Sequence, residues 1–568
     1  MAISTSEWLD QFFESYYRNR PVSATFIGVH EYDDRLPDYS ESSVARLLSE
    51  TRALLDQVDT GVVDAPATTW EAIDRLLARN FLLTQVWEWG DSRVMLDNPC
   101  LYTGEATFGI VSLLLREYSP LEERVASSVR RLTAIPELLA QGRSNVTSCP
   151  AAWVDKAVSE CDGGIALLTD GVEVLATRYG VTRPDCHEAA ATAVAAYREF
   201  RQYLIDEVTP AAHDNYAVGA EAFDMLLRLG HSLDLDGEAV TTYAHKRLAE
   251  ARAEMAALAA RIVPVADPQT LLSRHADDHP SVEDYYATYQ AEWDRSHAFT
   301  VERDLLHWPD YPITFEPIPN WAQAAAPHLY FLFYRAPAPF DTHVNQRYLV
   351  TPIEPDMPVD EQERRLRATN LSQIRLNHVI HHGGIGHHVQ NWWAYRGESR
   401  IGKMAAVDCA LRIAMLGGGT MAEGWACYAV DLMAEQGYLT PLEELSEQQG
   451  LARMAGRAIV DVGLHRGDLS FDEAVAFYRD EIGMSEAASR SEAVKNSMFP
   501  GAAMMYLIGT DAIHDLREEL RNRRGSDFNL GRFHDDFLSH GAIPVALTAK
   551  LMKGEPIDAD GYVSPRSD

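Results

Sequence analysis

Apolar residues that recur three and four positions apart run along most of this 568-residue chain, and this helical period constrains the fold more than any other feature. The clearest example lies between residues 240 and 262, and its apolar positions are Leu248, Ala251, Met255, Leu258 and Ile262. Pro264 and Pro268 follow, and proline ends a helix because it has no amide hydrogen. Similar stripes occupy residues 43–58, 70–88, 120–140, 187–208, 282–297, 362–396, 404–436, 443–466, 472–482 and 500–523. The pattern predicts a mainly α-helical protein.

Strand-like sequence is confined to short β-branched or aromatic runs, at residues 329–334 and 347–351, and these predict a small β-sheet. The turn-rich segment 265–279 is typical of a connection between two lobes. Long helical enzymes often remain one continuous body, so we expect two lobes around a cleft and not separable modules. The predicted parts are an N-terminal helical lobe over residues 1–264, a C-terminal lobe over residues 265–553 and a loose tail over residues 554–568.

The formal net charge of −34 argues against binding to nucleic acid or anionic lipid, because their phosphates would be repelled. No stretch is apolar enough over about 20 residues to span a bilayer. The N-terminal residues lack the basic start and apolar core of a secretion signal, so the predicted location is the cytoplasm. Six cysteines without a C-x-x-C pair are typical of unpaired thiols in the core.

Five histidines, at positions 378, 381, 382, 387 and 388, lie within eleven residues of this chain. Neutral imidazole is the commonest protein ligand for zinc and similar metals, so the cluster predicts a metal site. His378 and His382 have the i, i+4 spacing that places two side chains about 6 Å apart on one helical face. His381 and His387 would be about 9 Å apart along a straight helix and rotated by roughly 120°.

Three glycines, Gly383, Gly384 and Gly386, make a helix break between His381 and His387 easy. Two ligand pairs therefore remain open: His381 with His387 across a break, or His378 with His382 on an intact turn. A third interpretation is that these histidines are packed core residues.

A third ligand is supplied most naturally by Glu423, which follows Gly417-Gly-Gly-Thr420 and is expected in the first turn of a helix facing that break. Two histidines and a downstream glutamate with an open position are the ligand set of a catalytic zinc site. The competing interpretation of Glu423 is a carboxylate stabilised by the helix dipole.

These motifs resemble the bacterial family called domain of unknown function 885, which is similar in its core to helical zinc peptidases of the angiotensin-converting-enzyme and thimet-oligopeptidase kind. The resemblance rests on motifs spread over nearly the full length of the chain. The matching residues are His381, Gly386, His387, His388 and Gln390, then Glu423, Gly424, Trp425, Ala426 and Tyr428, with Pro21–Thr25, Gly28, His30, Asp33 and Arg35–Asp38 near the start and Pro500, Gly501, Tyr506, Gly509, Phe533–Asp535 and Gly541–Pro544 near the end. The resemblance implies a helical zinc-peptidase-like body whose metal ligands are His381, His387 and Glu423.

Three positions depart from the family pattern: His382 stands where the family has its general-base glutamate, Ile385 replaces a proline and Ala502 replaces a glutamine. A carboxylate there would take and return protons in zinc-dependent hydrolysis. Because His382 stands in its place, we expect peptidase activity to be lost or much reduced, with His382 or His388 handling protons. Tyr506 is the candidate for stabilising the oxyanion.

The sequence leaves three functions open. The first is a zinc-dependent hydrolase acting on short peptides or acylated small molecules in an internal cleft. The second is a non-hydrolytic, possibly biosynthetic, metalloenzyme, because two histidines and a carboxylate also suit non-haem iron. The third is an inactive, metal-free relative that uses the cleft for binding. The sequence does not predict the oligomeric state.

Overall fold

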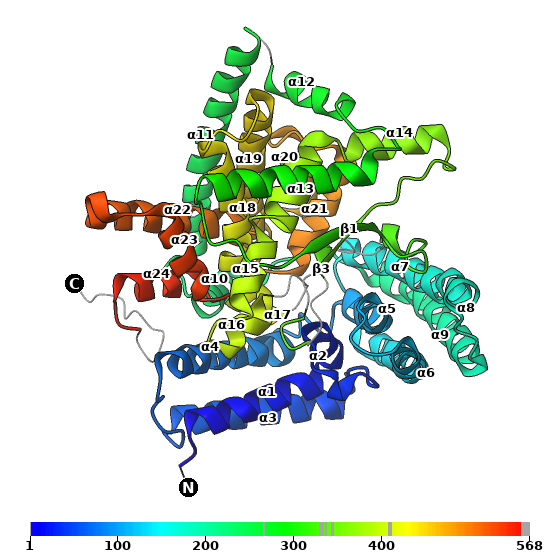
Figure 1. Ribbon diagram of the computed structural model, residues 1–568. Coiled ribbons are helices and arrows are strands. Elements are labelled where there is room, and N and C mark those ends of the chain that lie inside the picture. Colours follow the sequence, from blue (N-terminus) through cyan, green and yellow to red (C-terminus); the bar gives the residue numbers. More distant parts are fainter. Residues whose placement is uncertain are drawn as a thin grey trace. The chain divides into compact units, whose positions relative to one another are not determined.

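The computed structural model describes residues 2–264, 267–328, 334–335, 338–341, 346–406 and 412–557 (Figure 1). The chain divides into two compact units. Unit 1 comprises residues 1–215, 318–332 and 337–345, and unit 2 comprises residues 216–317, 333–336 and 346–568. The predicted lobe boundary at residue 264 differs from this division, because the helix ending at Ile262 packs within unit 2.

The described part of unit 1 is built from helices joined by loops, with two isolated β-bridges, Ile3 with Val63 and Pro150 with His213. Its α-helices are α1 (Thr5–Asn19), α2 (Pro21–Ile27), α3 (Glu41–Asp59), α4 (Thr69–Val86), α5 (Pro99–Leu115), α6 (Leu121–Asn145), α7 (Ala151–Ala166), α8 (Val172–Tyr179) and α9 (Pro184–Tyr203). Short 3-10 or π segments accompany them: η1 (His30–Tyr32), η2 (Trp87–Asp91), η3 (Leu167–Gly171), η4 (Leu204–Val208), η5 (Thr209–Ala211) and η7 (Ala326–His328).

Unit 2 carries every motif of the histidine and glutamate site. Its first helices are α10 (Ala220–His231), α11 (Gly237–Ile262), α12 (Pro268–Leu272), α13 (Tyr285–Glu302), α14 (Val359–Ala368), the π-helix η8 (Gln373–Gly383), α15 (His387–Ala394), α16 (Arg400–Ala405) and α17 (Arg412–Gly417). The others are α18 (Gly419–Glu435), α19 (Pro441–Arg466), α20 (Phe471–Asp480), α21 (Glu486–Met498), α22 (Met505–Arg524), α23 (Leu530–Ser539) and α24 (Val545–Lys553), with the 3-10 segments η6 (Ser273–Asp277) and η9 (Gly525–Asp527).

The predicted helical class is confirmed, and local capping explains where the two longest helices of unit 2 begin. Asp236 caps α11 by accepting a hydrogen bond from the amide of Ala239. At α19, Thr440 and Glu443 form a reciprocal capping box, and Pro441 occupies the first turn. The two helices lie side by side (Figure 1) and bury the apolar stripe that the period of α11 predicts.

The predicted small sheet is confirmed and has three strands in the order β1-β3-β2. Strand β1 (Ile313–Pro317) runs parallel to β3 (Gln346–Val350), and β2 (Tyr334–Arg335) pairs with β3 in the antiparallel sense. The predicted run 347–351 corresponds to β3, whereas residues 329–333 of the other predicted run lie outside the described residues. Strand β1 was not predicted from the sequence.

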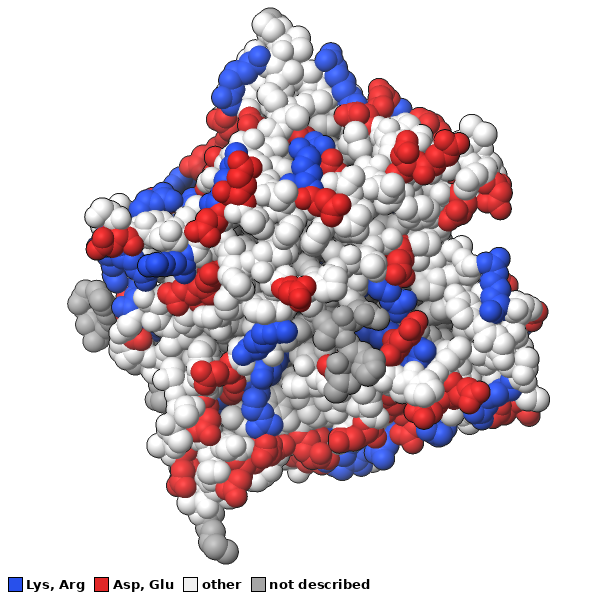
Figure 2. All heavy atoms as spheres, in the orientation of Figure 1, with Lys and Arg blue, Asp and Glu red and all other residues white. Residues whose placement is uncertain are grey.

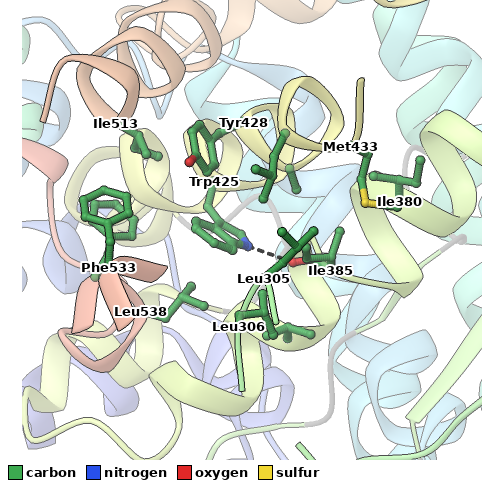
Figure 3. Close-up of a cluster of buried hydrophobic side chains, with 14 of the residues drawn as sticks. Leu305, Leu306, Ile380, Ile385, Trp425, Tyr428, Met433, Ile513, Phe533 and Leu538 are labelled. Atoms are coloured by element: carbon green, nitrogen blue, oxygen red, sulfur yellow. Dashed lines mark hydrogen bonds between the residues drawn. The ribbon is translucent and has the colours of Figure 1, made fainter. Parts of the chain in front are cut away.

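A large apolar cluster surrounds α18 and includes residues of the histidine segment (Figure 3). Trp425 and Tyr428 on α18 are fully buried, and the cluster also contains Ile380 and Ile385 from the histidine segment. Burying an aromatic side chain of this size contributes several kcal/mol, and truncating it to alanine costs about 3–5 kcal/mol. The histidine segment is thus anchored to α18 by the core itself.

No helix in the described part of the chain is long and apolar enough to cross a membrane. Five cysteines, Cys100, Cys149, Cys161, Cys186 and Cys427, are buried free thiols, as predicted, and Cys409 lies outside the described residues. On the displayed face, Lys and Arg are scattered among Asp and Glu instead of forming one broad basic area (Figure 2). Most of the predicted tail, residues 558–568, also lies outside the described residues.

Candidate metal centre

The predicted helix break between His381 and His387 is present. The π-helix η8 ends at Gly383, and α15 begins at His387. The amide of Gly386 turns back to donate to the carbonyl of Ile380 at 2.9 Å. A Cβ atom at Gly386 would lie only 1.9 Å from the carbonyl oxygen of His381, so only glycine fits this close approach.

Two tryptophan side chains hydrogen-bond the carbonyl groups that the break leaves without helical partners. The indole of Trp293 donates to the carbonyl of Gly383 at 2.9 Å. The indole of Trp425 donates to the carbonyl of Ile385, also at 2.9 Å (Figure 3). Buried carbonyls need such donors, because an unmade hydrogen bond costs free energy. The break is therefore a fixed part of the fold.

The histidines before the break lie in a π-helix, which the sequence did not predict. In a π-helix, each backbone amide donates to the carbonyl five residues earlier. The side chain of His382 spans the same five residues, because its Nδ1 donates to the carbonyl of Asn377 at 2.7 Å. His381 and His382 are neighbours, and their ring centroids are 4.6 Å apart. Helices of this kind are frequent at functional sites.

The structure brings together the three predicted ligands, His381, His387 and Glu423. Glu423 Oε2 lies 3.5 Å from His381 Nε2 and 3.6 Å from His387 Nε2. Ligand atoms about 2.1 Å from a tetrahedral zinc ion are about 3.4 Å apart, so these separations fit a bound cation. His382 joins the group, since one nitrogen from each of His381, His382 and His387 lies within 4.8 Å of the others.

The second ring nitrogen of each imidazole has its own contact, which leaves Nε2 to face the site. His387 Nδ1 donates to the side-chain oxygen of Gln390 at 3.0 Å, and His381 Nδ1 lies 3.9 Å from the sulfur of Cys427. Such outer contacts fix the tautomer and orientation of metal-binding histidines. The sequence pattern predicts no role for Gln390 or Cys427, although Gln390 follows His387 by three residues and Cys427 follows Glu423 by four residues on a helix.

Glu423 lies in the second turn of α18 and not in the first turn, as the sequence predicted, because the helix already begins at Gly419. Its other oxygen, Oε1, accepts a hydrogen bond from the hydroxyl of Tyr506 at 3.2 Å. Tyr506 reaches it because α18 and α22 touch at two glycines: a Cβ atom at Gly424 would lie 2.6 Å from the backbone of Gly509. The predicted oxyanion-stabilising tyrosine thus stands beside the ligand group.

The electrostatics of the group favour an anionic Glu423 and a neutral His382. Burial raises the pKa of Glu423, but His381 and His387 hold that pKa well below its ordinary value. Burial, reinforced by the neighbouring imidazoles, holds the pKa of His382 well below its ordinary value. The side chains of His381 and Glu423 are each 13% exposed and that of His387 is 2% exposed, and the facing atoms Glu423 Oε2 and His387 Nε2 are buried.

The two remaining histidines of the segment have other partners. His388 Nε2 donates to the carbonyl of Tyr311 at 2.5 Å, its ring stacks on that tyrosine, and burial lowers its pKa to about 4. His388 therefore lies apart from the ligand group, and the structure does not support its predicted role in proton transfer. His378 Nδ1 lies 2.5 Å from the hydroxyl of Tyr348, so the alternative pair His378 and His382 is not the one that converges with Glu423.

The fold and the site together define a class of protein: it is mainly helical, and its candidate metal centre lies where a π-helix is broken. The chain belongs to the family described as "Bacterial protein of unknown function (DUF885)", whose model matches residues 21–552. This confirms the family that its motifs resemble. The likeness to zinc peptidases stays a prediction.

Two solved structures share the fold. A protein from Shewanella oneidensis described as a lipoprotein of unknown function superposes with a TM-score of 0.77 at 21% identity and covers 97% of this chain and 100% of its own. A protein from Colwellia psychrerythraea, also described as a lipoprotein, gives a TM-score of 0.73 at 14% identity and covers 97% and 98%. The comparison with curated protein sequences finds no match.

Proposed function

We propose that this protein is a metal-dependent hydrolase of the zinc-peptidase type, in which His381, His387 and Glu423 hold the cation. The observation that carries the proposal is the placement of the buried Glu423 Oε2 at 3.5 and 3.6 Å from two imidazole Nε2 atoms. A bound divalent cation would act as a Lewis acid toward the carbonyl group of a substrate. Short peptides and acylated small molecules are the proposed substrates.

The chain's own residues supply the rest of the proposed chemistry. The hydroxyl of Tyr506, 3.2 Å from Glu423 Oε1, is placed to donate a hydrogen bond to negative charge that develops on a substrate oxygen. His382 donates from Nδ1 to Asn377, so its Nε2 keeps the lone pair that accepts a proton. An imidazole with a strongly lowered pKa is a poor proton carrier, and we propose that peptide hydrolysis is correspondingly slow.

Replacing His382 with glutamate tests the proposed loss of the general base. The zinc-loaded His382→Glu variant is expected to hydrolyse a pool of short fluorogenic peptides at least about 100-fold faster than the wild type, the rate gain typical of general-base catalysis. His382→Gln is the matched control, because it has the same chain length without a basic group. Equal rates for wild type and His382→Glu, with zinc bound to both, would contradict the assignment.

One observation favours a second candidate function, a non-hydrolytic metalloenzyme. His382 brings a third imidazole beside His381 and His387, the two histidines that also contact Glu423. A set with several imidazoles and a carboxylate also suits iron. Iron instead of zinc in the purified protein would support this candidate, and zinc would support the hydrolase.

The cytoplasmic location expected from the sequence remains a prediction. Both similar structures belong to proteins described as lipoproteins, which favours a location outside the cytoplasm for a relative of the same fold. Fractionation of cells that express the full-length chain decides between the two compartments: recovery in the cytosolic fraction would support the sequence-based expectation.

A further inference from the structure

A group of basic side chains borders Tyr506 on the side that faces α19 and α21. The guanidinium carbon of Arg457 lies 4.5 Å from the centre of the Tyr506 ring, and the ammonium nitrogen of Lys495 lies 5.9 Å from it. Both cations are therefore within cation–π distance of the tyrosine whose hydroxyl contacts Glu423. Positive charge accumulates next to the candidate metal centre.

One acidic residue lies within this group, and Arg457 already engages it. Arg457 binds both carboxylate oxygens of Glu492, at 3.0 and 2.9 Å. Burial raises the pKa of Glu492, but Arg457, Lys495 and Arg453 lower it to about 2. All three cations are thus close enough to act on the same carboxylate, which has its two oxygens committed to Arg457.

Arg453 is the cation of this group that is available to bind a further carboxylate. It precedes Arg457 by one turn of α19, its side chain is exposed to solvent, and within the described residues no carboxylate pairs with it. Its charge acts on Tyr506 and on the thiol of Cys427, which contacts His381. A solvent-exposed guanidinium therefore lies one helical turn from Arg457, the cation that packs on the ring of Tyr506.

The surplus of positive charge here contrasts with the chain as a whole, whose formal net charge is −34. A protein this acidic repels anions at long range, so an anionic substrate needs a local source of attraction. Guanidinium is suited to that task because its parallel N–H groups match the two oxygens of a carboxylate.

We infer that the substrate carries a free carboxylate and that Arg453 binds it, with Arg457 and Lys495 adding positive charge on the Tyr506 side of the site. This inference rests on the proposed hydrolase function, and it narrows the substrates to acidic compounds. Arg453 is thereby a specificity residue, while the metal ligands do not depend on it.

Matched metal-binding probes test the inference on the zinc-loaded, full-length protein. The monohydroxamates of succinic, glutaric and adipic acid each carry a carboxylate at a different reach, and their counterparts end in a primary amide. For the best chain length, calorimetry is expected to show at least about 10-fold tighter binding of the carboxylate form, the strength of a charge-assisted hydrogen bond. Arg453→Gln should reduce this affinity ratio to near one and should leave the affinity for the amide probe and the zinc content unchanged.

Arg261→Gln on α11 removes the same charge far along the exposed surface and should leave the ratio unchanged. Arg453→Lys should retain part of the preference. Equal binding of both forms by the wild type, or an unchanged ratio in Arg453→Gln, would overturn the inference while the metal site stands. If Arg453→Gln lost its zinc or no longer bound the amide probe, the inference would also be overturned, because Arg453 would then support the structure of the site. A wild type that binds no zinc would instead refute the proposed function.

Discussion

A group around His30 in unit 1 and the group around Glu423 in unit 2 both combine histidine with carboxylate, and they differ in how many of their polar atoms are hydrogen-bonded within the protein. In unit 1, His30 Nδ1 lies 2.9 Å from Asp33 and Nε2 lies 2.8 Å from Asp341, so both ring nitrogens are hydrogen-bonded to carboxylates. In unit 2, two imidazoles, those of His381 and His387, share Glu423 Oε2 at 3.5 and 3.6 Å. The first group is complete without a ligand, whereas the second has the spacing of atoms around a cation.

The chemistry of the donors supports the same distinction. Around His30, the acids Asp33 and Asp341 pair with two bases, His30 and Arg116, and the hydroxyl of Tyr118 donates a hydrogen bond to Asp33 at 2.7 Å. Around Glu423, the outer nitrogens of His382 and His387 bond to neutral oxygens, which turns lone pairs inward. Both groups include residues of the motifs that resemble the family, and the group around Glu423 is the one that we propose to bind a metal.

Removing a ligand should have the largest effect and should separate the two groups. His387→Ala is expected to weaken zinc binding by at least about 1000-fold, more than the 10–100-fold typical of outer-contact changes. His30→Ala, the matched substitution in unit 1, should leave zinc affinity unchanged. Competition with a chromogenic chelator measures both, and equal affinities for His387→Ala and wild type would contradict the ligand assignment.

Adding a methyl group at Gly386, in the helix break, should have the next largest effect, a decrease in the free energy of unfolding. In Gly386→Ala, the new methyl group would lie 1.9 Å from the His381 carbonyl, so the break must shift at a cost of about 3 kcal/mol in unfolding free energy. Gly450→Ala on α19 is the control, since open space surrounds that position and alanine favours helix by about 1 kcal/mol. Chemical denaturation compares the variants, and a Gly386→Ala protein as stable as wild type would argue against a fixed break.

Loss of the hydrogen bond that orients His387 should weaken zinc binding less than loss of a ligand does. Gln390→Ala removes the acceptor of the His387 Nδ1 hydrogen bond and is expected to weaken zinc binding by about 10–100-fold with little change in stability. Gln390→Glu keeps an acceptor and should retain affinity close to wild type. If Gln390→Ala binds zinc as tightly as wild type, this residue only packs against His387.

The smallest effect is expected from titrating His30. Burial lowers its pKa, but the hydrogen bonds to Asp33 and Asp341 raise it to about 9. A histidine with a raised pKa stabilises the folded state fully below its unfolded pKa of about 6.5, and this contribution is lost as the pH rises through about 9. The melting temperature should fall by a few degrees between pH 7 and 10, and His30→Asn should flatten that change. An identical decrease in His30→Asn would contradict the ion-pair role.

Sequence reasoning predicted those features of the fold that a regular period encodes. The stripe of Leu248, Met255 and Leu258 predicts α11 well, because one face of a long helix must be buried. The π-helix η8 was missed, since one extra residue per turn leaves the apolar pattern of a short segment almost unchanged. Strand β1 is only five residues long and acquires its role through pairing with β3, which local sequence does not specify.

The candidate site was predictable where a motif fixed it and unpredictable where distant packing did. His381, His387 and Glu423 follow from the family pattern and from the glycines between the histidines. The sequence offers His388 as an alternative to His382 for proton transfer, yet consecutive helical side chains diverge by about 100°, and His388 hydrogen-bonds to Tyr311. The basic group around Tyr506 depends on packing between α19, α21 and α22 that no motif reports.

The central claim is that the group around Glu423 binds a catalytic divalent metal. Elemental analysis of untagged wild-type protein, purified without added metal and compared with the Glu423→Gln variant, tests it most directly. The account predicts close to one zinc ion per wild-type chain and strongly reduced zinc in Glu423→Gln. Wild-type protein that neither contains nor takes up a transition metal would contradict the claim and would favour an inactive relative that only binds its ligand.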